Sequence, residues 1–211
     1  MPSAMTHELK HLVALGKRLL TDLPLEPVWL EEPSAVAAEE LAGFGSATRL
    51  TQAFARFALL NPQNYRVAWN GRPTDGLEQN SMYGFNFLLL WRIAEKQGHD
   101  NFWKSWVAGP ESGILNLEHH VGESFRSLML DWALTLLFDH TGQPASEYNY
   151  SSLNLHDGTW ARLGVKPLTT PLAGSARSMA YYGARGTGSD AVVEISSFSH
   201  APYFIIVRVS K

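Results

Sequence analysis

The chain has 211 residues, of which 45% are hydrophobic and 18% are charged, and its formal net charge at pH 7 is -3. This size and composition are those of a soluble globular protein with a full core, and the charge balance gives no basic field that would favour nucleic acid or an anionic membrane. The absence of cysteine excludes disulfides and thiolate metal ligands, and no apolar run has the length that a membrane span needs.

The first predicted helix covers about residues 3–21 and contains the segment His7-Glu8-Leu9-Lys10-His11. Residues four apart lie on one face of a helix, so both imidazoles can reach one metal ion with Glu8 beside them. The apolar residues of the helix have a helix-like spread. We expect them to be buried while the two histidines point to a cleft: Leu9, Leu12, Val13, Leu15, Leu19 and Leu20.

A third metal ligand is predicted about twenty residues beyond the second histidine, in the segment 29–32, which reads WLEE. Pro24 and Pro27 end the first helix and leave a connection long enough to bring a second helix back alongside it. Two histidines, one carboxylate and a water molecule form a standard ligand set for a catalytic zinc ion. The spacing alone allows either Glu31 or Glu32 to face the metal.

The other elements follow from helix-forming residues, apolar periodicity and glycine or proline stops. Helices are expected at about 31–41, 47–60, 81–97, 100–107, 114–121 and 124–140, with a loop at 70–76 and with Asp100 as a helix cap. Beyond residue 154 the pattern is typical of strands, at 180–184, 191–196 and 203–209. The sequence therefore predicts an α+β fold, with a mainly helical domain over residues 1–155 and a small antiparallel β-rich domain over residues 156–211.

The histidine segment and the segment 29–32 together resemble the HExxH…WLxE pattern of the gluzincin metallopeptidases. The segments 83–90, 124–134 and 148–155 are similar to segments of the hyicolysin family of secreted neutral metallopeptidases, so that the resemblance covers about residues 5–160. It implies a zincin-like helical domain and a Zn²⁺ ion held by His7, His11 and Glu32, with Glu8 as the general base. It also implies a protein or peptide substrate and a secreted or periplasmic location, although no signal peptide is recognisable in this sequence.

Two features depart from that family pattern. Related sites have an acid one helical turn after the glutamate ligand, where it supports a zinc-bound histidine, but Val36 stands one turn after Glu32. The support must therefore come from Glu39, Glu40 or elsewhere. Peptidases of this class also place a twisted sheet before the metal-binding helix, and only six residues precede His7. We expect that the sequence starts inside a longer protein, or that the upstream half is lost and zinc is bound without efficient cleavage.

Tyr83 is the residue that we assign to stabilising an oxyanion, because it starts the aromatic-rich helix near the point where related gluzincins have such a tyrosine. Their tyrosine stands further ahead of the following glycine than Tyr83 stands ahead of Gly84. The alternative is that Tyr83 is a core aromatic residue. His119 and His120 are adjacent and point to different faces of a helix, which favours a solvated pair over a second metal site.

Three functions are compatible with these observations. The leading one is a zinc-dependent endopeptidase that hydrolyses peptide bonds with a metal-activated water and Glu8 as base. The second is a zinc-binding domain without proteolytic activity. The third is a non-enzymatic adhesion or carbohydrate-binding module in which the β-rich tail binds the ligand.

Overall fold

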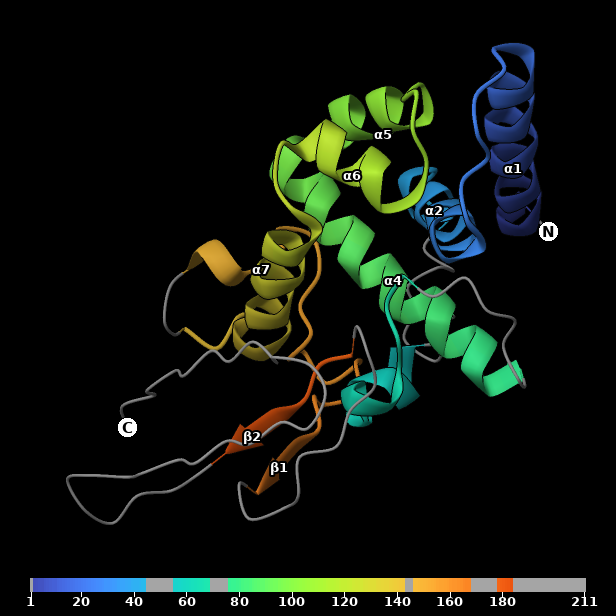
Figure 1. The fold of residues 1–211 in the computed structure, drawn as a ribbon. Coiled ribbons are helices and arrows are strands. Elements are labelled where there is room, and N and C mark those ends of the chain that lie inside the picture. The colour runs from blue at the N-terminus through green and yellow to red at the C-terminus, as the bar shows by residue number, and fades with distance from the viewer. Residues whose placement is uncertain (1, 45–54, 69–75, 143–145, 168–177, 184–211) are drawn as a thin grey trace.

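The computed structural model describes residues 2–44, 55–68, 76–142, 146–167 and 178–183, and its elements are drawn in Figure 1. The helices are α1 Pro2–Leu20, α2 Val28–Leu41, α4 Gly76–Gln97, α5 His99–Val107, α6 Gly113–Val121 and α7 Phe125–Phe138. Residues 55–60 are also helical. Two single 3-10 turns, η1 Pro62–Asn64 and η2 Ser146–Tyr148, and two strands, β1 Val165–Pro167 and β2 Tyr181–Gly183, complete the described elements. The prediction of a mainly helical protein is confirmed.

Helix α4 is the centre of the fold, and it packs against α2, α5 and α7 (Figure 1). Three successive side chains, Leu88, Leu89 and Leu90, are fully buried. Successive residues of a helix point about 100° apart, so this run means that the middle of α4 is surrounded by protein on all sides. The helix begins five residues earlier than predicted, at Gly76.

Helix α2 begins directly after Pro27, three residues earlier than predicted, so that residues 29 and 30 also lie within it. Pro27 stands at the N-terminal boundary, where its missing N–H group costs no helical hydrogen bond. Ala35 and Ala37 are fully buried, and these small side chains let α2 pack closely on α4. The position of α2 against the core is therefore well determined, and with it the position of the glutamates that α2 carries.

Helix α1 packs on α2 through its polar face, and the expectation that its leucines are buried is wrong. The packed side contains His7, Lys10, His11, Ala14 and Arg18, whose spacing of three or four residues forms one stripe along a helix. The apolar side chains project from the other sides. All of them are exposed, from 41% for Leu15 to 89% for Leu20: Leu9, Leu12, Val13, Leu15, Leu19 and Leu20.

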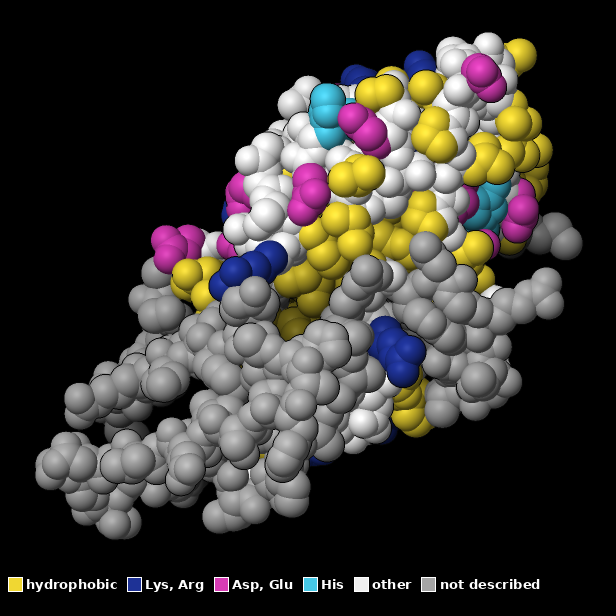
Figure 2. All heavy atoms as spheres, viewed as in Figure 1, with side chains coloured by type: hydrophobic (Ala, Val, Ile, Leu, Met, Phe, Trp, Pro, Cys, Tyr) yellow, Lys and Arg dark blue, Asp and Glu magenta, His cyan; other side chains and the backbone are white. Residues whose placement is uncertain are grey.

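The exposed apolar side chains of α1 lie in the upper right of Figure 2, where hydrophobic atoms form much of the visible surface. The physical reason is geometric. A helix that turns its histidine stripe toward a neighbour must turn the opposite stripe toward solvent, because the two are fixed on the same rigid backbone. The ion pairs of the polar stripe decide which face is buried.

The two described strands pair in parallel, which does not support the predicted antiparallel arrangement. Val165 pairs with Tyr181 and Pro167 with Gly183 in the same chain direction. Residues 168–180 separate the two strands, and a connection of about a dozen residues is what a parallel crossover requires, whereas an antiparallel hairpin needs only a short turn. Strand β2 lies within the predicted strand 180–184. The predicted strands 191–196 and 203–209 and residues 70–75 of the predicted loop lie outside the described residues. Gly76, the last residue of that loop, is the first residue of α4.

The remaining helix ends agree with prediction to within a few residues, with one error. Helix α5 begins at His99 after Gly98, which has a φ of 80° that favours glycine, so Asp100 lies in the first turn and is not the cap. Helix α7 begins after Ser124, whose hydroxyl accepts a hydrogen bond from the backbone N–H of Ser127. Within the described part of the chain, no helix combines the length and apolar character that crossing a membrane requires.

Candidate metal centre

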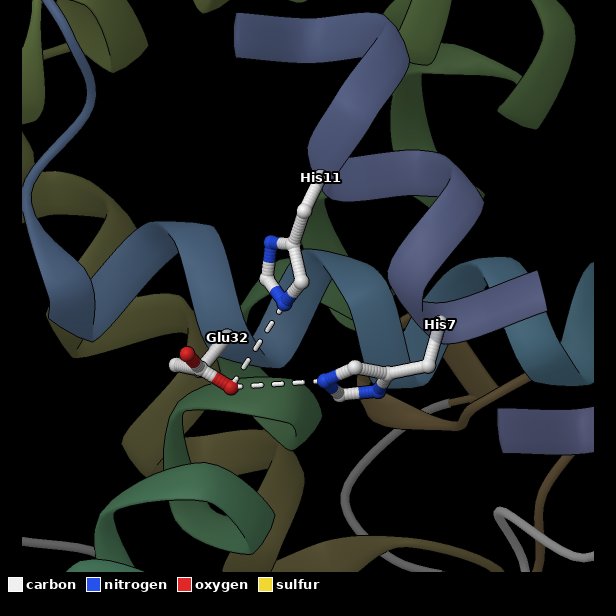
Figure 3. Close-up of side chains that lie close together, drawn as sticks. All are labelled: His7, His11 and Glu32. Carbon is white, nitrogen blue, oxygen red and sulfur yellow. Dashed lines mark hydrogen bonds and ion pairs between the residues drawn. The ribbon is translucent and has the colours of Figure 1, made fainter. Parts of the chain in front are cut away.

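Helices α1 and α2 bring two histidines and one glutamate together. His7 and His11 lie one turn apart on α1, and their ring centroids are 4.8 Å apart with the planes at 76°. Glu32 projects from α2 toward both rings, and one of its oxygens faces a nitrogen of each (Figure 3). The Nε2 atom of His7 lies 3.4 Å from Oε2 of Glu32, and Nε2 of His11 lies 3.8 Å from the same oxygen.

These three residues can hold one metal ion. One ligand atom from each residue lies within 4.8 Å of the other two. Zinc bonds to histidine nitrogen and carboxylate oxygen are about 2.0–2.2 Å long, so ligands arranged tetrahedrally around one ion are about 3.3 Å apart. Both nitrogen-to-oxygen distances are close to this value, and side-chain rotation can close the remainder. The predicted ligand set His7, His11 and Glu32 is therefore assembled.

The second nitrogen of each ring contacts a further carboxylate. His7 Nδ1 lies 2.8 Å from Oε1 of Glu39, and His11 Nδ1 lies 3.0 Å from Oε1 of Glu31. A neutral imidazole that donates its Nδ1–H to a carboxylate presents the lone pair of Nε2 for coordination, as carboxylate–histidine–metal arrangements do. Both rings are thus oriented with Nε2 toward Glu32, and the carboxylates at Nδ1 favour the tautomer that a metal bound beside Glu32 requires.

In the family pattern, an acid one turn after the glutamate ligand supports a histidine. Here two other glutamates of α2 contact the histidines. Val36, one turn after Glu32, is 4% exposed and belongs to the core. Support for His7 comes instead from Glu39, two turns after Glu32, which was one of the predicted sources. Glu39 is buried and also accepts a hydrogen bond from the Ser3 hydroxyl.

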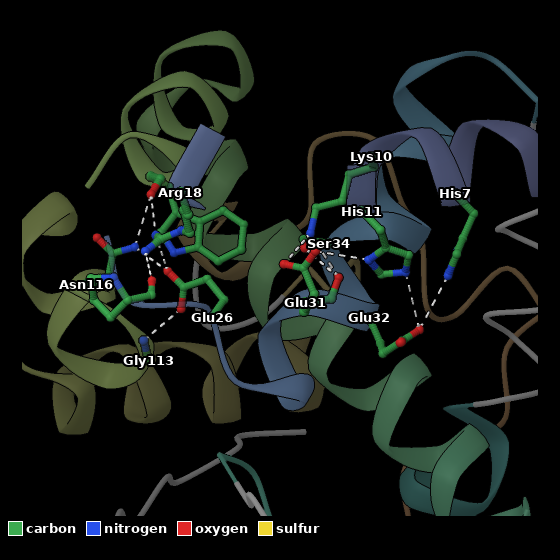
Figure 4. Close-up of polar contacts among 12 residues, drawn as sticks. His7, Lys10, His11, Arg18, Glu26, Glu31, Glu32, Ser34, Gly113 and Asn116 are labelled. Atoms are coloured by element: carbon green, nitrogen blue, oxygen red, sulfur yellow. Dashed lines mark hydrogen bonds and ion pairs between the residues drawn. The ribbon is translucent and has the colours of Figure 1, made fainter. Parts of the chain in front are cut away.

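Sequence reasoning missed the role of Glu31, which it treated only as an alternative ligand. The side chains of Glu31 and Glu32 leave α2 about 100° apart, so one can reach the near side and the other the far side of a ring on α1. Figure 4 shows Glu31 and Glu32 on opposite sides of His11. The adjacency of two acids opposite a pair of histidines was the available signal.

The electrostatics of the site reflect these contacts. The hydrogen bond to Glu32 raises the pKa of His7, partial burial works against this, and Glu39 adds to the rise. The same hydrogen bond lowers the pKa of Glu32. Burial lowers the pKa of Lys10, although the adjacent Glu31 carboxylate opposes the change.

The charges of the site match a divalent cation. Glu31, Glu32 and Glu39 contribute three negative charges around the two rings, and Lys10 contributes one positive charge through its ion pair with Glu31. With both imidazoles neutral, the group has an excess of two negative charges. A divalent ion bound at the three ligands would neutralise these two charges. Because the site is partly buried, such neutralisation favours binding of the ion.

Tyr83 reaches the site from α4. Its hydroxyl accepts a hydrogen bond of 2.8 Å from the side-chain amide of Gln79. Burial raises the pKa of Tyr83, and the neighbouring Glu32 carboxylate raises it further through charge and a side-chain hydrogen bond. The predicted Tyr83 is thus next to the predicted ligand Glu32, and its hydroxyl remains protonated at neutral pH.

Glu8 is positioned differently from the other predicted residues. It lies on the exposed surface of α1 and makes no hydrogen bond or ion pair with any of the described residues. The structure thus brings His7, His11, Glu32 and Tyr83 together, but it does not bring Glu8 into contact with them. Its assignment as general base stays a prediction.

The other predicted histidine pair has structural partners. His119 Nδ1 lies 3.2 Å from a carboxylate oxygen of Glu111, and its side chain is 57% exposed. His120 Nε2 lies 2.5 Å from the carbonyl oxygen of Ser105. Among the described residues, neither histidine belongs to a group that could hold a metal ion.

A second polar cluster anchors the end of α1. Arg18 is 2% exposed and lies 2.5 Å from a carboxylate oxygen of Glu26, and it also donates to the carbonyl oxygens of Glu111 and Trp106. Glu26 in turn accepts hydrogen bonds from the backbone of Gly113 and the side chain of Asn116 (Figure 4). This cluster fixes α1 to the segment from α5 to α6, and with it the direction of the histidine stripe.

Comparison with known proteins adds no relative. No protein-family model matches this chain, and neither a curated protein nor a solved structure matches it. What can be concluded about function therefore comes from the chemistry of the site itself.

Proposed function

We propose that this chain is a zinc-dependent endopeptidase of gluzincin type, with the metal held by His7, His11 and Glu32. The observation that supports this proposal is that the candidate ligand atoms of the three residues face one another. The Nε2 atoms of both rings face one oxygen of Glu32, while both Nδ1 atoms contact other carboxylates. Two nitrogen donors and one oxygen donor suit Zn²⁺, and three protein ligands leave one coordination position open.

The residues around the site are assigned complementary roles. When bound by three protein ligands, zinc lowers the pKa of a water molecule to about 7 and polarises a carbonyl group. Glu8 follows the first ligand on α1, and we assign its carboxylate to accept a proton from the attacking water and deliver it to the leaving amine. Tyr83, protonated beside Glu32, is assigned to donate a hydrogen bond to the oxyanion that develops on the substrate.

A second candidate is a zinc-binding domain without peptidase activity. The specific observation in its favour is the exposure of Glu8, which no described residue holds in place. A general base must lie within hydrogen-bond reach of the proton that it removes, and an unrestrained side chain spends little time there. The two candidates share the same metal ligands and differ only in catalysis.

Metal analysis and one substitution separate these candidates. We expect purified protein to contain one zinc ion per chain and to cleave casein or an unstructured peptide. Glu8→Gln is expected to retain zinc and to lower kcat/KM by about 100- to 10,000-fold, the usual contribution of a general base. The control is Asp100→Asn, which alters an acid that is 96% exposed and pairs with Lys104 on α5.

Each result points to one candidate. Zinc with cleavage that depends on Glu8 supports the peptidase. Stoichiometric zinc without cleavage supports the silent zinc-binding domain. Protein that binds no zinc even after incubation with excess metal would overturn both.

A further inference from the structure

Lys10, between the two candidate ligand histidines, is a buried cation with one carboxylate partner. Its side chain is only 12% exposed, although lysine is among the residues that are almost never buried without a partner. Nζ lies 2.7 Å from Oε2 of Glu31 and donates a 3.1 Å hydrogen bond to the Glu31 carbonyl oxygen. It also lies 5.8 Å from the centroid of the Trp106 ring on α5.

The two oxygens of the Glu31 carboxylate have different partners. Oε2 pairs with Lys10, while Oε1 lies 3.0 Å from Nδ1 of His11. An ion pair with a buried ammonium group restrains the side-chain torsions and the position of a carboxylate far more than contact with water does. Fixing one oxygen therefore fixes the direction of the other, and the direction of the ring that it holds.

We propose that Lys10 is a positioning residue for the candidate metal centre. It holds Glu31 so that Glu31 retains His11 with Nδ1 protonated and Nε2 directed at Glu32. The ring of Trp106, itself 1% exposed, supports the ammonium group from the core side. This inference rests on the proposed metal site, and it assigns a function to a position that the HExxH pattern leaves unspecified.

The two histidines are supported in different ways, so the proposed role of Lys10 concerns His11 and not His7. Glu39, the partner of His7, receives a hydrogen bond from the Ser3 hydroxyl, whereas Glu31, the partner of His11, pairs with Lys10. Loss of Lys10 should thus disturb His11 and leave the contact between His7 and Glu39 in place. His7 serves as an internal reference in the same molecule.

The direction in which zinc affinity changes when Lys10 is replaced distinguishes a positioning role from a purely electrostatic one. Removing a positive charge beside the metal favours a cation by Coulomb attraction, and so predicts tighter zinc binding. Loss of the support of a ligand typically weakens metal binding about 10- to 100-fold. We expect Lys10→Met, which keeps an apolar stem against Trp106, to weaken zinc binding by about tenfold or more. Lys10→Arg, which keeps the charge and the donors, should remain closer to the wild type.

The experiment measures zinc affinity by competition with a chromophoric chelator for the wild type, Lys10→Met, Lys10→Arg and the control Lys17→Met. Lys17 is an exposed lysine on the same helix, so its loss removes the same charge without touching Glu31. Weaker binding in Lys10→Met alone supports the inference. Unchanged or tighter binding in Lys10→Met overturns it.

A second measurement needs no metal and so separates this inference from the proposed function. Nitrogen-15 spectra of the imidazoles in metal-free protein report which ring nitrogen carries the proton. We expect the Nδ1–H signal of His11 to be lost in Lys10→Met while that of His7 persists. If both signals persist, the positioning role is overturned, whether or not the wild type binds zinc. A selective loss at His11 supports the role even if no zinc is bound and the proposed function fails.

Discussion

Each of the two candidate ligand histidines has its own carboxylate, and the surroundings of these carboxylates differ. The side chain of Glu39 is 8% exposed, while that of Glu31 is 24% exposed. A buried carboxylate is costly unless its partners compensate for lost hydration, and the contacts of Glu39 with His7 and Ser3 contribute to this compensation. The more buried support should contribute more to the orientation of its ring.

Replacing Glu39 tests this contribution. Glu39→Gln keeps the shape and an acceptor oxygen but removes the charge that strengthens the bond to the His7 Nδ1–H. We expect zinc affinity, measured by chelator competition, to fall about 10- to 100-fold. Asp100→Asn, remote from both rings in sequence and 96% exposed, should leave the affinity unchanged. An affinity equal to that of the wild type in Glu39→Gln would show that Glu39 does not support a metal ligand.

At the scale of helices, α1 is the element that the sequence predicted least well. Its bounds, and the fact that both histidines share a face, followed from the helical period. The rotation of the helix about its own axis was predicted wrongly, because the apolar residues were expected to face the core. Leu12 is 66% exposed, whereas Arg18 is 2% exposed. The polar stripe has long-range partners on α2, on α5 and in the segment between α5 and α6, and these were not visible in the local pattern.

The Arg18 cluster provides a test of that explanation. Arg18→Met leaves Glu26 buried without its ion-pair partner, and breaking a buried pair typically costs about 3–5 kcal/mol of unfolding free energy. We expect urea unfolding to report a loss of this size. The double variant Arg18→Met with Glu26→Gln should recover part of it, since no uncompensated charge remains. A loss below about 1 kcal/mol for the single variant would mean that the pair does not anchor α1.

The sequence predicted the candidate site more completely than it predicted the sheet. His7, His11 and Glu32 converge as the motif and the resemblance implied, because a fixed spacing on one helix and a short connection to the next leave few arrangements. The contacts of Glu31 and Lys10 depend on how two helices face each other, which spacing does not specify. Strand direction is similar, because strands as short as β1 and β2 have too few residues to indicate their direction.

At the scale of the whole molecule, the site holds much of the net charge. The chain has a net charge of -3, and the glutamates around the two rings exceed the adjacent lysine by two charges. Such an excess, gathered where the side chains are partly buried, is stabilised either by protons or by a cation. The stability of the protein should thus depend on pH in opposite ways with and without metal.

Two of the groups with shifted pKa values, His7 and Glu32, determine this pH dependence between acid and neutral pH. The pKa of His7 is raised above its ordinary value of 6.5, so its contribution is fully present below that value and is lost as pH rises through the folded-state pKa. The pKa of Glu32 is lowered below its ordinary value of 4.5, so its contribution is present above that value and is lost as pH falls through the folded-state pKa. The metal-free protein should gain most from this pair between pH 4.5 and 6.5.

Thermal unfolding checks this prediction. The Tm of metal-free protein is expected to fall from pH 6 to pH 8 by an amount that His7→Gln removes. With saturating zinc the trend should reverse, because coordination requires unprotonated imidazole and binding releases protons. A Tm of the metal-free protein that rises over this range and is insensitive to His7→Gln would contradict the assignment.

All three candidate ligands come from α1 and α2, and His7 and Glu32 are separated by 25 positions in the sequence. An ion bound to both would join α1 to α2 in the folded protein and would stabilise that state by its binding free energy. The sequence contains no cysteine with which to make such a link covalently. The metal proposed for hydrolysis would therefore also act as a reversible link between the first helix and the rest of the protein.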